Sequence, residues 1–217
     1  MLFAGGALSL VFAFAFMLPS DPETLALGAK APNAELKMDD ISGTQMSLND
    51  LKKDNGLLVI FSCNTCPFVV GSDDSEGWEV KYAELRKLCE MQNIGMVLVN
   101  SNEAKREKGD NMADMKTRAT ANGFGHVSYV LDQNSVLADA FGARTTPHVF
   151  LFDKDLKLAY RGAIDETSAN PKDAKSPYLS NAMSNMTAGK TIDPNDTRPM
   201  GCSIKRIVTT VVEILSN

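Results

Sequence analysis

The segment "GLLVIFSCNTCPFVV", residues 56–70, joins an apolar run to two cysteines that stand three positions apart. Continuous apolar runs of this length are typical of a strand that is covered on both faces, as in the centre of a parallel sheet. The proline after the second cysteine suits the first turn of a helix, where its missing N–H costs nothing. The segment therefore predicts a central strand over 56–62, followed by a helix that begins between Asn64 and Pro67.

Cys63 and Cys66 have the spacing of a redox-active dithiol. The free N–H groups at the start of a helix stabilise an anion such as a thiolate. We therefore expect the pKa of Cys63 to be lowered and its sulfur to be partly exposed. Cys66 is expected one turn further in, where it can close a small disulfide ring with Cys63. A Cys-x-x-Cys pair beside a strand–helix–strand pattern indicates thiol–disulfide chemistry.

The rest of the chain alternates between strand and helix patterns. A hairpin around Ser42-Gly43 precedes a short helix with Ser47 as its N-cap. Helical patterns then cover 76–92, 109–125, 135–142 and 177–188, and strand patterns cover 94–102, 127–132, 145–153 and 157–164. Alternating elements predict parallel strands with helical crossovers, while the late hairpin adds antiparallel ones. The expected fold class is α/β, with a central mixed sheet flanked by helices on both faces.

A second motif, "RTTPHVFLFD" at 144–153, places a Thr-Pro pair directly before a buried strand. Such an X-Pro bond is a candidate for the cis form. In a thioredoxin-like fold this proline faces the dithiol, and a polypeptide partner pairs with the backbone beside it. Thr146, Pro147 and His148 are therefore predicted to shape the substrate site, with His148 either tuning the thiolate or lying in the core.

Together these motifs resemble the thioredoxin-like redoxin superfamily, and most closely a peroxiredoxin-like (AhpC/TSA) subgroup with a Cys-x-x-Cys motif. The resemblance spans roughly residues 27–206 and implies a thioredoxin fold and thiol redox chemistry. No cofactor and no metal are expected. The stretches that carry it are 63–68, 99–103, 145–153, 160–165 and 201–205.

The chain departs from two relatives of this superfamily. If Cys66 is aligned with the peroxidatic cysteine of peroxiredoxins, Cys63 stands where they carry Thr or Ser, and Val59 stands where they carry proline. Thioredoxins carry a buried acid in the strand before the dithiol, whereas residues 57–61 contain none. Peroxidase activity is therefore not implied, and proton transfer must use water or a group elsewhere in the chain.

The sequence favours a thiol–disulfide oxidoreductase in which the Cys63 thiolate attacks a substrate disulfide and Cys66 resolves the mixed disulfide. Its expected partners are protein thiols and disulfides, or a protein that supplies reductant. Two alternatives stay open. One is an antioxidant thiol peroxidase that uses Cys66 against peroxide, and the other is a copper-binding or delivery protein that uses Cys63, Cys66 and His148.

Two further cysteines have less defined roles. Cys89 falls on the apolar face of a predicted helix, where a free cysteine behaves as a small, inert hydrophobe. Cys202 lies in "PMGCSIK", after Pro194 and Pro199. It either returns to the dithiol as a third thiol or packs as a structural thiol, and the sequence favours the structural role.

Net charge and the uncharged N-terminal segment indicate the partners and the location of the protein. The 217 residues carry a formal net charge of -5 with no long basic block, which argues against a nucleic-acid partner. Residues 2–18 contain no charged residue, so 1–20 is predicted to be a signal peptide or N-terminal membrane anchor, the only membrane contact. The protein is expected to be exported, either periplasmic or anchored facing the periplasm. The redoxin domain is expected over 27–190, and an extension over 191–217 is expected to pack on it or in an oligomer contact.

Overall fold

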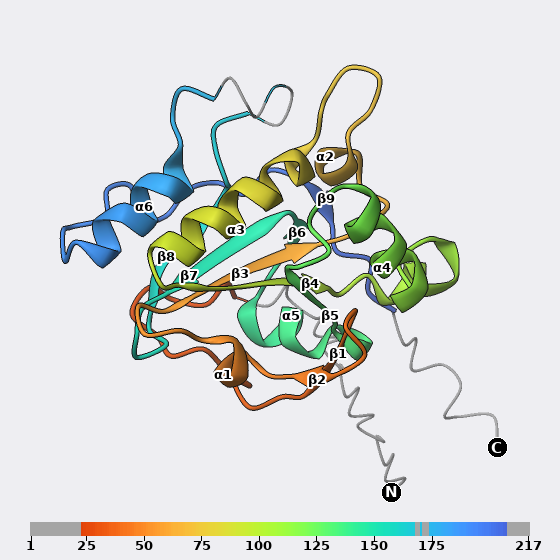
Figure 1. Ribbon diagram of the computed structural model, residues 1–217, viewed down its shortest axis with the longest axis horizontal. Helices are drawn as coiled ribbons and strands as arrows, with labels where there is room; N and C mark the ends of the chain where they lie inside the picture. The colour runs from red at the N-terminus through yellow and green to blue at the C-terminus, as the bar shows by residue number, and fades with distance from the viewer. Residues whose placement is uncertain (1–22, 168–169, 171–173, 208–217) are drawn as a thin grey trace, which may run out of the picture.

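A mixed sheet with helices on both faces organises the computed structural model, which describes residues 23–167, 170 and 174–207 (Figure 1). The predicted leader at 1–20 and the last part of the tail lie outside the described residues. Within these described ranges, no helix is long and apolar enough to cross a membrane. The expected α/β architecture is confirmed.

Seven strands form the main sheet in the order β2-β1-β5-β4-β3-β7-β8 among the described residues. Strand β3 is parallel to β4 and antiparallel to β7, and β4 is parallel to β5. The strands are β1 (Met38–Asp40), β2 (Gln45–Met46), β3 (Leu57–Ser62), β4 (Gly95–Asn100), β5 (Ser128–Leu131), β7 (His148–Phe152) and β8 (Leu158–Gly162). A separate pair consists of β6 (Thr145–Thr146) and β9 (Cys202–Ser203).

The helices lie in two layers around this sheet (Figure 1). Helices α3, α4 and α6 supply buried side chains to the core on one face, and α1 and α5 supply them to the core on the other. Their bounds are α1 (Leu48–Leu51), α2 (Pro67–Val70), α3 (Tyr82–Met91), α4 (Met112–Ala121), α5 (Val136–Phe141) and α6 (Tyr178–Thr187). Short 3-10 turns are η1 (Trp78–Lys81), η2 (Glu103–Lys108) and η3 (Gln133–Ser135).

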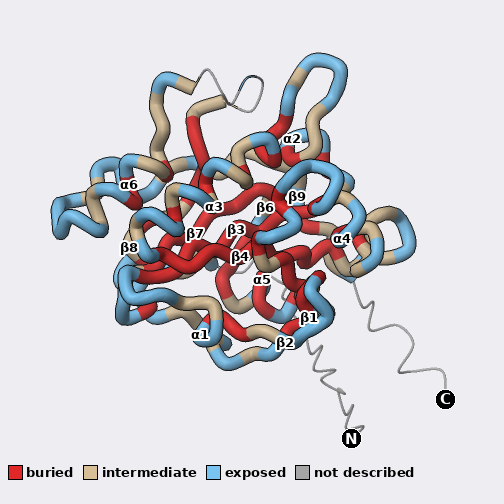
Figure 2. Tube along the Cα trace, in the orientation of Figure 1, coloured by how far each residue is buried: buried red, intermediate tan, exposed pale blue. Residues whose placement is uncertain are grey.

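The apolar run at 57–61 forms strand β3, which is covered on both faces of the sheet. Leu58 and Ile60 point into one core, whereas Leu57, Val59 and Phe61 point into the other. None of the five is exposed to solvent, because successive strand side chains alternate between two covered faces. The buried centre and the exposed helical surfaces are visible in Figure 2. The predicted central strand is therefore confirmed.

Both edges of the sheet are short or covered by other parts of the chain. Strand β2 at one edge has two residues. At the other edge, the backbone of Leu158 in β8 exchanges hydrogen bonds with Gly28 and Ala29 at 2.8 and 2.9 Å. Arg161 in the same strand exchanges two more with Asn195 and Thr197, at 3.1 and 3.0 Å. The start of the predicted domain and the extension that follows it thus both lie along β8.

Candidate active site

The dithiol lies at the C-terminal end of β3, where the chain turns into α2. Cys63 follows the strand directly, and Cys66 is the N-cap of a helix that begins at Pro67. Both cysteines are buried, with 1% and 3% of their surface exposed. The predicted partial exposure of Cys63 is wrong, because the residue is buried in the core with the Thr146 hydroxyl against its sulfur.

Thr146, the last residue of β6, touches both cysteines. Its hydroxyl lies 3.0 Å from the sulfur of Cys63, and its carbonyl oxygen lies 3.3 Å from the sulfur of Cys66, from which it accepts a hydrogen bond in the protonated form. The Thr146–Pro147 peptide bond is cis, as the sequence predicts. The structure therefore brings Cys63, Cys66, Thr146 and Pro147 together at one site.

The more acidic of the two thiols is Cys66. A hydrogen bond from the Cys63 thiol, supported by the Cys202 thiol and by the N–H groups of Cys202 and Phe68, lowers the pKa of Cys66 to about 5 against the effect of burial. Burial raises the pKa of Cys63 well above its ordinary value, and the hydrogen bond to Cys66 and the negative charge of Asp110 raise it further.

This assignment corrects the sequence-based expectation of a lowered pKa at Cys63. The helix starts at Pro67, the last residue of the predicted range, so the N–H of Phe68 donates to Cys66 and not to Cys63. An anion is stabilised by the donors that point at it, and these converge on Cys66.

Cys202 belongs to the same site. Strand β9 pairs with β6 in antiparallel register, with Cys202 opposite Thr146. The N–H of Cys202 donates a hydrogen bond to the sulfur of Cys66 at 3.3 Å. Burial and the neighbouring Cys66 raise the pKa of Cys202 to about 11. The sequence favours a structural thiol here, whereas the structure brings this third thiol to the dithiol.

His148 faces the other side of the sheet. It begins β7, but its ring packs 4.5 Å from that of Phe150, in the core that also holds Phe61. Its Nδ1 accepts the N–H of Arg144 at 3.3 Å, and burial lowers the pKa of the imidazole to about 3. Both cysteines belong to the opposite core, because they stand in the turn beyond the end of β3 and not in the alternating part of the strand.

The predicted alternative of a copper site that uses Cys63, Cys66 and His148 is therefore wrong, because His148 lies on the other side of the sheet from the two cysteines. Among the residues that the structure describes, no group of three or more His, Cys, Asp or Glu side chains is arranged to hold a metal ion.

Asp110 is a buried acid at the site that sequence reasoning did not find. Its carboxylate accepts hydrogen bonds from the Asn64 N–H and the Thr65 hydroxyl, both at 2.7 Å. It also accepts the side-chain amides of Asn100 at 2.8 Å and Asn102 at 3.1 Å. These bonds fix the turn between the two cysteines. The "VNSN" stretch at 99–102, the polar end of the strand predicted over 94–102, was the available signal for this polar cluster.

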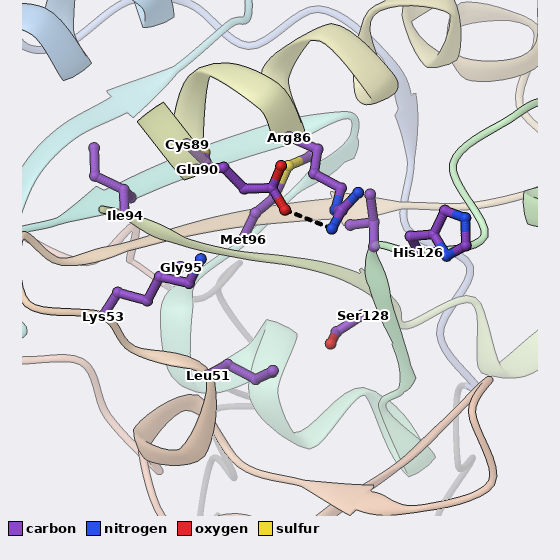
Figure 3. A pocket seen from close by; sticks show the side chains of 11 residues that line it. Leu51, Lys53, Arg86, Cys89, Glu90, Ile94, Gly95, Met96, His126 and Ser128 are labelled. Atoms are coloured by element: carbon purple, nitrogen blue, oxygen red, sulfur yellow. Dashed lines mark hydrogen bonds and ion pairs between the residues drawn. The ribbon is translucent and has the colours of Figure 1, made fainter. Parts of the chain in front are cut away.

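A cavity of about 160 Å³ lies away from the dithiol (Figure 3). It opens near the start of β4, whereas the cysteines follow the far end of the parallel strand β3. Cys89 lines it behind the Arg86–Glu90 ion pair, and burial raises the pKa of this thiol to about 12. These surroundings agree with the inert thiol that the sequence predicts for Cys89.

Comparisons with known proteins identify the family. An uncharacterized conserved protein from Geobacillus kaustophilus is 26% identical, with a TM-score of 0.76 over 89% of this chain and 99% of that chain. A hypothetical protein from Sinorhizobium meliloti 1021 is 28% identical, with a TM-score of 0.74 over 86% and 98% of the two chains.

The peroxidoxin BcpB from Mycobacterium tuberculosis is 16% identical, with a TM-score of 0.52 over 75% of this chain and 96% of that chain, and it shows a shared thioredoxin-like fold. No curated protein matches this chain. The redoxin family model matches residues 26–176, so this chain belongs to the redoxin family.

Proposed function

We propose that this redoxin is a thiol–disulfide oxidoreductase that works through Cys63 and Cys66. One observation carries the proposal. The sulfur of Cys66 receives hydrogen bonds from a second thiol and from backbone N–H groups, which is the environment that stabilises a nucleophilic thiolate. Because Cys63 adjoins it, a mixed disulfide formed on Cys66 can be resolved within the protein.

The mechanism assigns different roles to the two thiols. The Cys66 thiolate attacks a substrate disulfide, forms a mixed disulfide and releases one substrate thiolate. Cys63 then loses its proton and attacks the sulfur of Cys66, which closes the Cys63–Cys66 disulfide and releases the second substrate thiolate. The Thr146 hydroxyl, 3.0 Å from Cys63, donates to the sulfur as it becomes anionic. This order of attack reverses the order that the sequence favours.

Peroxide reduction is a second candidate, and the lowered pKa of Cys66 favours it as well. A peroxidase also needs groups that orient the peroxide. Among the described residues, no arginine donates a hydrogen bond to the sulfur of Cys66, and Cys63 stands where peroxiredoxins carry a hydroxyl. Disulfide exchange requires only what this site contains, which is a second thiol within reach.

A single-turnover experiment separates the two reactions. The fully reduced protein is mixed with insulin, as a protein disulfide, or with hydrogen peroxide, and the loss of free thiols is followed. We expect insulin disulfides to be reduced and a Cys63–Cys66 disulfide to form, with peroxide consumed at the slow rate of an ordinary thiol. Rapid consumption of peroxide together with inert insulin disulfides would reject the oxidoreductase in favour of the peroxidase.

The reactivity of Cys66 should depend on pH with an unusually acidic midpoint. Only the thiolate reacts with iodoacetamide, so the alkylation rate should rise as the pH passes through about 5 and then reach a plateau, because the pKa of Cys66 is lowered to that value. The rate is measured by mass spectrometry of the peptide that contains Cys66. Glutathione serves as the control, with the midpoint of an ordinary thiol at about 8.5. A midpoint for Cys66 in that ordinary range would refute the stabilised thiolate.

We also propose that the protein acts after export. The uncharged segment at 2–18 supports this location, since it has the length and composition of a signal peptide or anchor. Disulfides persist in oxidising compartments, where protein disulfides and dithiols are available as partners.

A further inference from the structure

The backbone beside cis-Pro147 already carries a partner strand, and that strand belongs to the same chain. Strand β9 pairs antiparallel with β6, so that Ser203 lies opposite Thr145 and Cys202 opposite Thr146. A strand added to such an edge gains its affinity from main-chain hydrogen bonds. The C-terminal segment thus occupies the position that a bound polypeptide substrate would take.

Contacts on both sides hold this strand in place. After it, the N–H of Ile204 donates to the carbonyl of Arg144 at 3.0 Å, and the N–H of Lys205 donates to the side chain of Asn102 at 2.9 Å. Ile204 is 5% exposed and packs in the core that also holds Phe61. Before the strand, a Cβ on Gly201 would overlap the carbonyl oxygen of Thr146, so only glycine allows this close approach.

The three sulfurs differ in access. Cys63 and Cys66 are buried, whereas Cys202 is partly exposed. Its N–H binds the sulfur of Cys66 directly. A folded partner protein would therefore meet Cys202 before it could reach either thiol of the dithiol.

We propose that Cys202 is a third redox thiol, an internal substrate that exchanges disulfides with Cys66. This inference rests on the proposed function. In the oxidised protein, the Cys202 thiol gives up its proton and its sulfur attacks Cys66. The Cys66–Cys202 bond forms, the Cys63–Cys66 bond breaks, and the electron pair leaves on Cys63, which takes up a proton. One disulfide and one thiol are present before and after the step, so it needs no further oxidant. The Cys66–Cys202 disulfide then presents its outer sulfur to a dithiol of the partner.

The first test removes Cys63 and asks what resolves a mixed disulfide on Cys66. The reduced Cys63→Ser protein is treated with one molar equivalent of dithiodipyridine, and the coloured thiopyridone is counted. We expect two equivalents to be released from this site and peptide mapping to show a Cys66–Cys202 disulfide. In the Cys63→Ser/Cys202→Ser control, one equivalent should be released and a stable pyridyl adduct should remain on Cys66. The Cys63→Ser/Cys89→Ala protein, which lacks the remaining cysteine outside the site, should again release two equivalents of thiopyridone.

The second test moves the strand and keeps every thiol. Gly201→Ala should displace β9 from Thr146 and raise the alkylation rate of Cys66 in the reduced protein about tenfold, which corresponds to about 1.4 kcal/mol less stabilisation of the closed strand. Gly125→Ala is the matched control, because its Cβ would meet Thr120 at an ordinary contact distance of 3.4 Å. An unchanged rate in Gly201→Ala would show that β9 does not cover the dithiol.

The outcomes distinguish this inference from the proposed function. A stable adduct on Cys66 in the Cys63→Ser protein, combined with normal exchange by the wild-type protein, would overturn the role of Cys202 and leave the dithiol intact. Absence of disulfide exchange in the wild-type protein would overturn the proposed function itself.

Discussion

Replacement of Cys66 by serine is expected to lower the rate of disulfide exchange by at least about a thousandfold. A serine hydroxyl is almost entirely protonated at neutral pH and does not attack a disulfide, whereas the lowered pKa of Cys66 keeps its sulfur anionic. The measurement is the initial rate of insulin reduction with an excess of a small thiol reductant. Thermal unfolding of the variant is followed in parallel to show that the fold persists.

Cys89→Ala is the matched control for this substitution. Cys89 is also a buried cysteine, but it lies on α3 beside a cavity at the other end of the sheet. We expect its removal to leave the exchange rate within about twofold, since it touches no group that reacts. Near-normal exchange by the Cys66→Ser protein would reject Cys66 as the attacking thiol.

Replacement of Phe141 by alanine is expected to destabilise the fold by about 3 to 5 kcal/mol. The ring is fully buried on α5, and its centre lies 5.4, 5.1 and 5.6 Å from those of Phe61, Phe150 and Phe152 in edge-to-face arrangements. Truncation removes all three aromatic contacts and leaves a cavity against β3 and β7. Urea denaturation followed by circular dichroism gives the change in the free energy of unfolding.

Val136→Ala on the same helix is the control for the loss of aliphatic volume. Val136 is 44% exposed, so its truncation should change stability by about 0.5 kcal/mol or less. If Phe141→Ala were no more harmful than this control, the aromatic cluster would not be the centre of that core.

The sequence predicts the frame of the site because its strongest signals are local. The apolar run at 57–61 specifies a covered central strand, and Pro147 directly before the strand at 148–152 specifies the segment that faces the cysteines. Each of these conclusions depends on residues that are close together in the chain, so periodicity and proline chemistry suffice.

The electrostatics of the site depend on contacts that periodicity does not encode. Which of the two cysteines has the lower pKa depends on where in the range 64–67 the helix begins. Sequence patterns locate such a helix boundary poorly. Asp110 reaches the turn at Asn64 from 46 positions away, and Cys202 reaches Cys66 from 136 positions away. The side of the sheet that His148 faces follows from strand register, which single-sequence patterns leave open at a strand end.

The covered edges of the sheet bear on how the protein behaves when it is concentrated. A long row of unpaired backbone donors and acceptors is a template on which foreign chains can add and grow into fibrils. In the described structure, edge strand β2 is only two residues long. The outer edge of β8 is hydrogen-bonded to residues 28–29 at Leu158 and to residues 195–197 at Arg161. The folded protein therefore provides a poor seed for strand-by-strand aggregation, and loss of solubility should follow unfolding rather than precede it.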